Sequence, residues 1–345
     1  MPEAAAQVRD ETGETTPVLE AVGLRTHFFT DLGVIRAVDG VTLRVVRGET
    51  LALVGESGSG KSVTGLSVMR LLGRTSGRIV GGEIFFARRS GMRVDLARIP
   101  EDTMRAIRGR EIAMVFQDPM SSLNPVFTVG EQIAEVIVQH QHRSHAEALG
   151  EAVSLLRLAG LPAAEQRITD YPHQLSGGMR QRVMIAIALA CDPLLLIADE
   201  PTTALDVTVQ AQIVALLARL QRERRLSVIF ITHDLRLVSE IADRIAVMYC
   251  GQVVEEGRAQ DVLSEPRHPY TLALLDCVPS PKRSRTLRGI PGYPADPADP
   301  PNGCRFHPRC RFAVEECRTK PPPFLVAEPG HLSRCIRHAE LRALR

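Results

Sequence analysis

The spacing of apolar residues changes along the chain and divides it into predicted strands and helices. From Val18 to Val46, apolar and polar residues alternate, as they do at Val41, Leu43 and Val45. A period of two predicts antiparallel strands. Residues 75–98 continue this pattern in short Gly- and Arg-rich stretches, so we expect an antiparallel β subdomain in the N-terminal part of the chain.

Short apolar runs from residue 50 onward alternate with segments of helical length. The predicted strands are 50–54, 111–118, 194–198, 227–232 and 244–249. The predicted helices are 63–72, 179–190, 209–222 and 235–241. This alternation predicts an α/β fold with a mostly parallel sheet and helices on its faces. Residues 119–125 interrupt it, and the helical pattern of 128–160 predicts a separate helical lobe at about 120–185.

A glycine-rich loop lies between the first of these strands and its helix. Its sequence, Gly55-Glu56-Ser57-Gly58-Ser59-Gly60-Lys61-Ser62, matches G-x-x-x-x-G-K-[ST]. Small residues let main-chain N–H groups turn toward phosphates, and the helix N-terminus adds partial positive charge. Lys61 is expected to reach the β- and γ-phosphates, and Ser62 to bind Mg²⁺. The loop therefore predicts a nucleotide site in a P-loop NTPase fold.

A pair of acidic residues follows the apolar strand at 194–198. We expect Asp199 and Glu200 to emerge at its carboxyl end, opposite the glycine loop. Asp199 would hold Mg²⁺ through its water shell, and Glu200 would orient or deprotonate the attacking water.

Aromatic residues are scarce, which makes Phe28 a candidate for the nucleotide base. An aromatic ring upstream of the phosphate loop can stack on adenine. A phenylalanine of the core or of a strand edge explains the same residue equally well.

Composition limits the function in a general way. With 44% hydrophobic and 24% charged residues in 345, the chain is typical of soluble globular proteins. A net charge of +2 indicates no nucleic-acid or membrane surface for the chain as a whole. Residues 1–16 are polar, are expected to form a disordered tail and lack the apolar segment of a signal peptide. We therefore expect a cytoplasmic protein that reaches a membrane only through partners.

The composition changes after residue 278. More than half of the 23 prolines lie between 279 and 329, which predicts little regular structure, and Lys and Arg exceed Asp and Glu beyond 282. Four cysteines lie here: Cys304, Cys310, Cys317 and Cys335. Their spacing matches neither a ferredoxin run nor a C-x2-C zinc knuckle, and it leaves free thiols, a zinc site and an iron–sulfur cluster open. His307 could replace one ligand.

Several motifs together resemble those of ATP-binding-cassette (ABC) ATPases. Gln174-Leu175-Ser176-Gly177-Gly178-Met179-Arg180-Gln181-Arg182 resembles the signature motif and lies between the phosphate loop and the acidic strand, as in that family. Gln117 resembles the Q-loop glutamine, Ala204-Leu205-Asp206 the D-loop and His233 the switch histidine. The resemblance covers about 17–265. It implies a RecA-like core with an antiparallel β subdomain and an inserted helical subdomain.

The resemblance also implies a role for each motif. Two cassettes would close head to tail, so that Ser176–Gly178 of one face the γ-phosphate held at Lys61 of the other. Gln117 would contact Mg²⁺ or the attacking water, and His233 would contact the γ-phosphate. Asp206 is expected to belong to the same composite ATP site.

Longer stretches resemble one branch of the family. Residues 117–125, 199–210 and 268–271 are similar to the ATPase subunits of dipeptide/oligopeptide importers, and related nickel importers share much of the pattern. We therefore expect 266–345 to form the C-terminal oligopeptide-transporter extension. Subunits of that group can carry four such cysteines around a [4Fe–4S] cluster, which makes a cluster the favoured interpretation here.

The branch implies a function and a set of partners. We expect an ATPase that couples ATP hydrolysis to peptide uptake, peripherally bound at the cytoplasmic face of the cell membrane. Its partners would be a second ATPase subunit, favoured to be a different chain, two transmembrane permease subunits and an extracytoplasmic peptide-binding protein, without nucleic acid. Nickel or another small solute is the alternative cargo, and a soluble ABC protein of DNA repair or translation is the alternative class.

Overall fold

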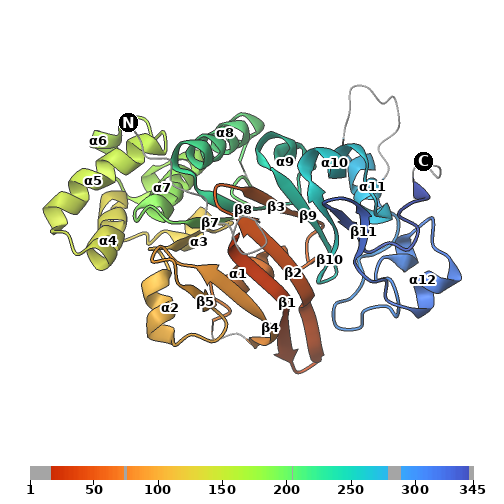
Figure 1. The fold of residues 1–345 in the computed structure, drawn as a ribbon. Coiled ribbons are helices and arrows are strands. Elements are labelled where there is room, and N and C mark those ends of the chain that lie inside the picture. Colours follow the sequence, from red (N-terminus) through yellow and green to blue (C-terminus); the bar gives the residue numbers. More distant parts are fainter. Residues whose placement is uncertain (1–16, 74–75, 204, 279–288, 342–345) are drawn as a thin grey trace.

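Two β-sheets organise the chain (Figure 1). The computed structural model describes residues 17–73, 76–203, 205–278 and 289–341; the predicted tail at 1–16 lies outside them. The larger sheet has the strand order β11-β12-β10-β9-β3-β8-β7-β6. Its strands are β3 (Thr50–Val54), β6 (Ile112–Val115), β7 (Leu195–Asp199), β8 (Ser227–Thr232), β9 (Arg244–Tyr249), β10 (Gln252–Arg258), β11 (Leu325–Glu328) and β12 (His331–Ser333).

The centre of the larger sheet is parallel, as the alternation of strands and helices predicts. β3 pairs in parallel with β8 and β9, and β7 pairs in parallel with β6 and β8. Every residue of β3, β7 and β8 is buried, which explains their continuous apolar runs. The carboxyl ends of β3, β6, β7 and β8 therefore meet at one edge.

The smaller sheet is the predicted antiparallel subdomain. Its order is β2-β1-β4-β5, with β1 (Pro17–Thr30), β2 (Gly33–Val46), β4 (Gly77–Ala87) and β5 (Arg93–Asp95). One face carries buried residues such as Leu19 and Ile84, which share a core with Leu53 and Ile197 of the larger sheet. The alternation in the sequence thus reflects one face of this sheet packed on the other layer.

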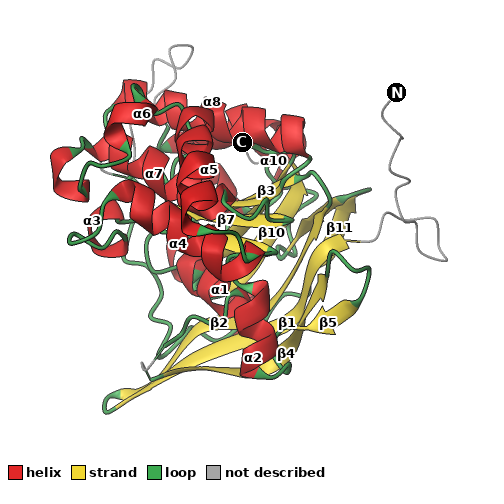
Figure 2. Cartoon of the chain, turned by 90° about the vertical axis from the view of Figure 1, so that its left-hand side faces the viewer, coloured by secondary structure: helices red, strands yellow, loops and turns green. Residues whose placement is uncertain are grey.

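Helices form the faces of the larger sheet and a lobe at one end (Figures 1 and 2). The lobe contains α3 (Pro119–Ser122), α4 (Val129–Gln141), α5 (His145–Leu158), α6 (Ala164–Arg167) and α7 (Gly177–Leu189). The remaining helices are α1 (Lys61–Val68), α2 (Glu101–Ile107), α8 (Val207–Arg224), α9 (Leu235–Ile241), α10 (Ala259–Ser264), α11 (Pro269–Asp276) and α12 (Glu315–Thr319). Within the described ranges, none of the helices is both long and apolar enough to cross a membrane.

The predicted helical segment 128–160 is two helices, because the chain turns at 142–144. His142 has a left-handed backbone, and Ser144 forms a capping box with Glu147 that starts α5. Apolar residues of α4, α5 and α7 pack into one core with α8 and the sheet, which fixes the lobe on the larger sheet.

The C-terminal region joins the larger sheet, which the proline-rich composition does not predict. β12 pairs with β10, and β11 pairs with β12. Glu255 of β10 is fully buried and accepts bonds from the N–H groups of Arg267 (2.5 Å) and His268 (2.9 Å), while its carboxylate also meets Nε2 of His331 at 2.7 Å. Rings of Tyr249, Tyr270 and Phe306 pack together beside it.

Candidate active site

The glycine loop runs between β3 and α1 and passes very close to neighbouring backbone. Gly55 has φ +154° and Gly60 has φ +102°. A Cβ on Gly55 would lie 2.2 Å from the carbonyl oxygen of Met248, and one on Gly60 would lie 2.2 Å from that of Ala37. Only glycine fits both positions. α1 begins at Lys61, so its first N–H groups face the loop.

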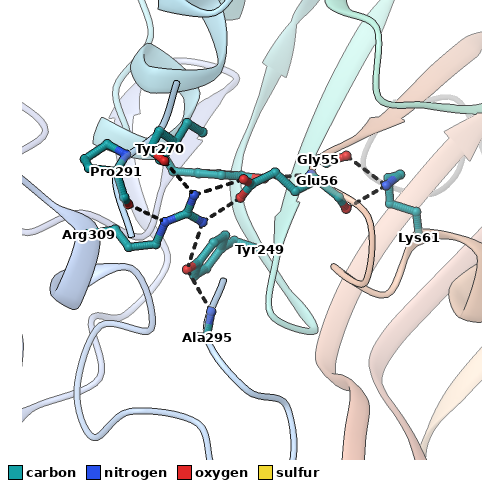
Figure 3. A network of polar contacts seen from close by, with 9 residues as sticks. Gly55, Glu56, Lys61, Tyr249, Tyr270, Pro291, Ala295 and Arg309 are labelled. Atoms are coloured by element: carbon teal, nitrogen blue, oxygen red, sulfur yellow. Dashed lines mark hydrogen bonds and ion pairs between the residues drawn. The ribbon is translucent and has the colours of Figure 1, made fainter. Parts of the chain in front are cut away.

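Lys61 is held at the loop by main-chain oxygens. Its Nζ donates to the carbonyls of Gly55 (2.8 Å) and Glu56 (2.9 Å), and the side chain is buried (Figure 3). Burial lowers the pKa of Lys61, and the carboxylates of Glu200 and Asp199 partly oppose this shift. A buried cation with carbonyl partners is well placed to exchange them for phosphate oxygens.

Ser62 and Asp199 form the candidate Mg²⁺ site. The Ser62 hydroxyl donates to Oδ1 of Asp199 at 2.8 Å, and Asp199 is buried at the end of β7. Burial raises the pKa of Asp199, and the Ser62 hydrogen bond opposes that shift. Hydroxyl and carboxylate oxygens are the donors that Mg²⁺ prefers, so these residues fit the ion.

Glu200 lies in a strained backbone conformation and is surrounded by polar side chains. Its φ is +45°, and its N–H donates to the carbonyl of Ile231 at 2.9 Å. Its carboxylate accepts from Nε2 of Gln117 (3.2 Å) and Oγ1 of Thr203 (2.9 Å), and Nδ1 of His233 lies 3.4 Å from it. Left-handed non-glycine residues concentrate at functional sites, which fits a reacting carboxylate here.

One cleft of about 1000 Å³ brings most of the predicted residues together. It is lined by the glycine loop and by Phe28, Gln117, Glu200 and His233. Ser59 and Asp199 are buried next to it. The cleft has the size of a small-molecule or cofactor site.

The signature residues lie apart from this cleft. Ser176 caps α7 by accepting from the N–H of Met179 at 3.4 Å, and Asp206 caps α8 by accepting from Val209 at 3.0 Å. A Cβ on Gly178 would lie 2.6 Å from Val209, while Gly177 faces Leu205. Within one chain, Ser176, Gly177, Gly178 and Asp206 are therefore close to one another and separate from the glycine loop.

Several residues of the site were not found from the sequence. Ile290, Pro294 and Pro297 of the C-terminal region line the cleft, and the carbonyl of Pro297 accepts from the N–H of Arg36 at 2.9 Å. Thr203 also contacts Glu200. No local pattern marks the three cleft residues, because they reach the site only through the long-range fold.

The four C-terminal cysteines line a second, smaller cavity together with His268 and Phe306. None of the seven cysteines forms a disulfide bond. Burial, with a smaller contribution from the other cysteines of the group, raises the pKa of Cys304 to about 11 and that of Cys335 to about 12. Among the described residues, no three His, Cys, Asp or Glu side chains are placed to hold a single metal ion.

His268 also lines this cavity, as a buried and neutral imidazole. Its Nδ1 accepts from the N–H of Tyr270 at 3.1 Å, which leaves the proton of the neutral ring on Nε2. Burial lowers the pKa of His268 to about 3, and a hydrogen bond to the main chain of Arg334 partly opposes the shift. A cubane cluster takes one cysteine per iron, so its thiols surround a cavity rather than one point. The four thiols line one cavity, which is the arrangement that the ligands of such a cluster would need.

These features define a P-loop ATPase: a glycine loop on a parallel sheet, a buried lysine, a Ser–Asp pair and a strained glutamate in one cleft. Comparison with known proteins identifies the family. The ABC transporter model matches residues 38–203, and the model for the C-terminal region of oligopeptide/dipeptide transporters matches residues 254–317.

Curated relatives match nearly the whole chain. A putative peptide import ATP-binding protein of Brucella melitensis is 53% identical over 95% of this chain and 99% of its own length. The oligopeptide transport ATP-binding protein AppD of Bacillus subtilis is 50% identical over 94% of this chain and 97% of its own length. The chain belongs to the ABC transporter family, as an ATP-binding and ATP-hydrolysing protein.

Solved structures agree with this assignment. A dimeric bacterial ABC transporter cassette is 29% identical, with a TM-score of 0.61 over 70% of this chain and 98% of its own. A post-hydrolysis dimer of the same cassette bound to ADP and Pi gives a TM-score of 0.62 over 70% of this chain and 98% of its own. The predicted P-loop fold with its antiparallel and helical subdomains is confirmed.

The backbone contact of Gly60 gives a direct test of the loop geometry. Gly60→Ala should weaken ATP binding by at least about tenfold, because the left-handed φ alone costs roughly 1–2 kcal/mol and Ala37 leaves no room for the methyl group. Gly150→Ala is the matched control, since a Cβ there meets no atom within 4 Å. Equal ATP affinity of both variants, measured by titration of a fluorescent nucleotide, would contradict the geometry.

Proposed function

We propose that this protein is the ATP-hydrolysing subunit of an importer that carries dipeptides or oligopeptides across the cytoplasmic membrane. The observation that carries the proposal is the pairing of an intact ATPase cleft with a C-terminal region of the oligopeptide/dipeptide transporter type in one chain. Relatives named for peptide import and oligopeptide transport, matched over almost their full length, support it.

Each residue of the cleft has a role in this proposal. Lys61 binds the β- and γ-phosphates, and Ser62 and Asp199 hold Mg²⁺, which neutralises phosphate charge. Glu200 takes a proton from the attacking water. Gln117 and His233 flank its carboxylate, at 3.2 Å and 3.4 Å, where they orient the water and contact the γ-phosphate. Catalysis then rests mainly on positioning and charge neutralisation.

The separation of the signature residues supports a two-cassette site. Ser176–Gly178 form the N-terminus of α7, where free N–H groups favour an anion, yet they lie apart from the cleft of their own chain. In our proposal they and Asp206 complete the cleft of a second cassette. One neighbour in structure is itself described as dimeric.

Phe28 lines the cleft, as does Ile290 of the C-terminal region, so the cleft offers apolar side chains to an adenine ring. We propose that Phe28 stacks on the base. Two transmembrane permease subunits and an extracytoplasmic peptide-binding protein complete the assembly, with this chain bound at the cytoplasmic face.

The base assignment predicts a clear separation of binding from turnover. Glu200→Gln should lower ATP hydrolysis by roughly 10²–10⁴-fold and leave ATP binding intact, because the amide keeps the shape of the side chain but cannot take a proton. Glu240→Gln on the exposed end of α9 is the matched control. Phosphate release and nucleotide titration measure the two steps, and wild-type turnover of Glu200→Gln would refute the assignment.

The importer proposal predicts specific companions in the membrane. Affinity purification from solubilised native membranes should recover two multi-span subunits, a second cassette and a peptide-binding protein, identified by mass spectrometry. Recovery of a nickel-binding protein in place of the peptide-binding protein would indicate that the cargo is nickel. Recovery only from the soluble fraction with nucleic acid attached would overturn transport and leave the ATPase chemistry unaffected.

We also propose that Cys304, Cys310, Cys317 and Cys335 hold a [4Fe–4S] cluster. The cluster would fix a proline-rich region that has few apolar residues for a core of its own. The raised pKa values of Cys304 and Cys335 mean that these two thiols carry protons at neutral pH, and binding must displace them.

Metal analysis tests the cysteine site. Protein purified without oxygen should contain about four iron and four sulfide per chain and absorb as a brown chromophore. Reconstitution should become more favourable as pH rises, because displacing each thiol proton then costs less free energy. Cys310→Ser should lose the iron, whereas Cys191→Ser should retain it, because Cys191 contacts Val136 of α4 and does not line the cavity. Stoichiometric zinc without iron would contradict the cluster.

A further inference from the structure

An arginine of the C-terminal region reaches the glycine loop of the ATP site. Arg309 lies between the cysteines Cys304 and Cys310, and its guanidinium forms a two-point ion pair with Glu56 (Figure 3). Nη1 donates to Oε2 at 2.7 Å and Nη2 donates to Oε1 at 3.0 Å. Two parallel bonds of this kind are the strongest geometry for an arginine and a carboxylate.

The remaining donors of Arg309 are also bound, so the side chain has one orientation. Nε donates to the carbonyl of Pro291 at 3.0 Å, and Nη1 lies 3.4 Å from the hydroxyl of Tyr249. The side chain of Arg309 is only 4% exposed. An arginine that is buried with every edge occupied acts as a fixed charge rather than as a mobile surface group.

Glu56 is held a second time through its main chain. Its N–H donates to the hydroxyl of Tyr270 at 2.8 Å, and Tyr270 belongs to α11 of the C-terminal region. The carbonyl of the same residue accepts from Lys61. The position of Glu56 is therefore set jointly by Lys61 and by Tyr270 and Arg309 of the C-terminal region.

The charge of Glu56 needs a counter-charge at this place. Glu56 lines the ATP cleft, where an unpaired carboxylate would repel the phosphates. Arg309 neutralises it from the side facing the C-terminal region. We propose that Arg309 is a positioning residue of the ATP site, which holds Glu56 and the glycine loop in the phosphate-binding arrangement and makes ATP affinity depend on the C-terminal region.

This inference rests on the proposed function only in assuming that ATP binds at the glycine loop. Arg309 precedes Cys310, which lines the cysteine cavity, and it binds Glu56 of the glycine loop. The cavity and the phosphate site are therefore linked through a single residue. Coupling between two sites is reciprocal in binding free energy. Whatever orders the segment around Cys310 should therefore tighten ATP binding, and ATP should in turn protect that segment.

A set of variants of the full chain tests the proposal. Arg309→Met should weaken MgATP binding about tenfold, because Glu56 is left charged beside the phosphates. Adding Glu56→Gln to that variant should restore most of the affinity, since the repulsive charge is gone. Arg309→Lys should recover only part of it, because lysine cannot form the two-point contact. Nucleotide titration gives the dissociation constants, and thermal unfolding is followed in parallel.

Two matched controls separate positioning from general stability. Arg311→Met removes the same charge from an exposed neighbour, and Arg305→Met breaks another buried ion pair of the same region, made with Asp39. Both should keep the ATP affinity of the wild type, although Arg305→Met should lower the unfolding temperature. Equal weakening by Arg305→Met and Arg309→Met, or no rescue by Glu56→Gln, would overturn the proposal.

A labelling experiment tests the reciprocal effect. In the metal-free protein, MgATP should slow maleimide modification of Cys310 several-fold in the wild type and in Arg311→Met, but not in Arg309→Met. Equal protection in all three proteins would overturn the coupling. Loss of ATP binding in every protein, the wild type included, would instead refute the proposed ATPase site, so the two failures are distinguishable.

Discussion

The close approach of the glycine loop to two strands is the constraint on which the rest of the structure depends. Gly55 passes against the carbonyl of Met248 in β9, and Gly60 passes against that of Ala37 in β2. The loop is thus enclosed between the larger and the smaller sheet, and neither sheet can shift without changing the phosphate cradle. The shared core of Leu19, Ile84, Leu53 and Ile197 holds the sheets at this distance. The packing of these apolar residues therefore also determines the geometry of the ATP site.

The order of the parallel strands brings the candidate catalytic residues together. β7, β8 and β3 are neighbours in the sheet, so the residues that follow their carboxyl ends lie close together at one edge. Asp199 ends β7, Glu200 follows it, His233 follows β8 and the glycine loop follows β3. The strained φ of Glu200 turns its carboxylate toward Gln117, which reaches the edge from β6. The signature residues belong to α7 in the other lobe, which explains why they do not join this edge.

Local pattern was sufficient where elements bury a regular face. The strand 227–232, the helix 235–241 and the strand 244–249 have the bounds that apolar spacing predicts, and half of the residues that line the cleft belong to the predicted motifs. The prediction failed where long-range contacts stabilise the segment. β12 is three residues long and exists because buried Glu255 binds His331 and β10 offers a free edge, and no spacing within 331–333 signals that. The entry of Ile290, Pro294 and Pro297 into the cleft has the same origin.

The variable positions of a motif can carry as much information as the fixed ones. The phosphate-loop pattern leaves the residue after its first glycine open, so the sequence alone assigns Glu56 no role. In the folded chain, the carboxylate of Glu56 would weaken phosphate binding unless a cation neutralised it. Arg309, more than two hundred residues away in the sequence, supplies that cation. The same position receives Tyr270 on its main chain. Through these two contacts the C-terminal region packs against the glycine loop, whose geometry is fixed by phosphate binding. The region is therefore part of the structure that supports the ATP site.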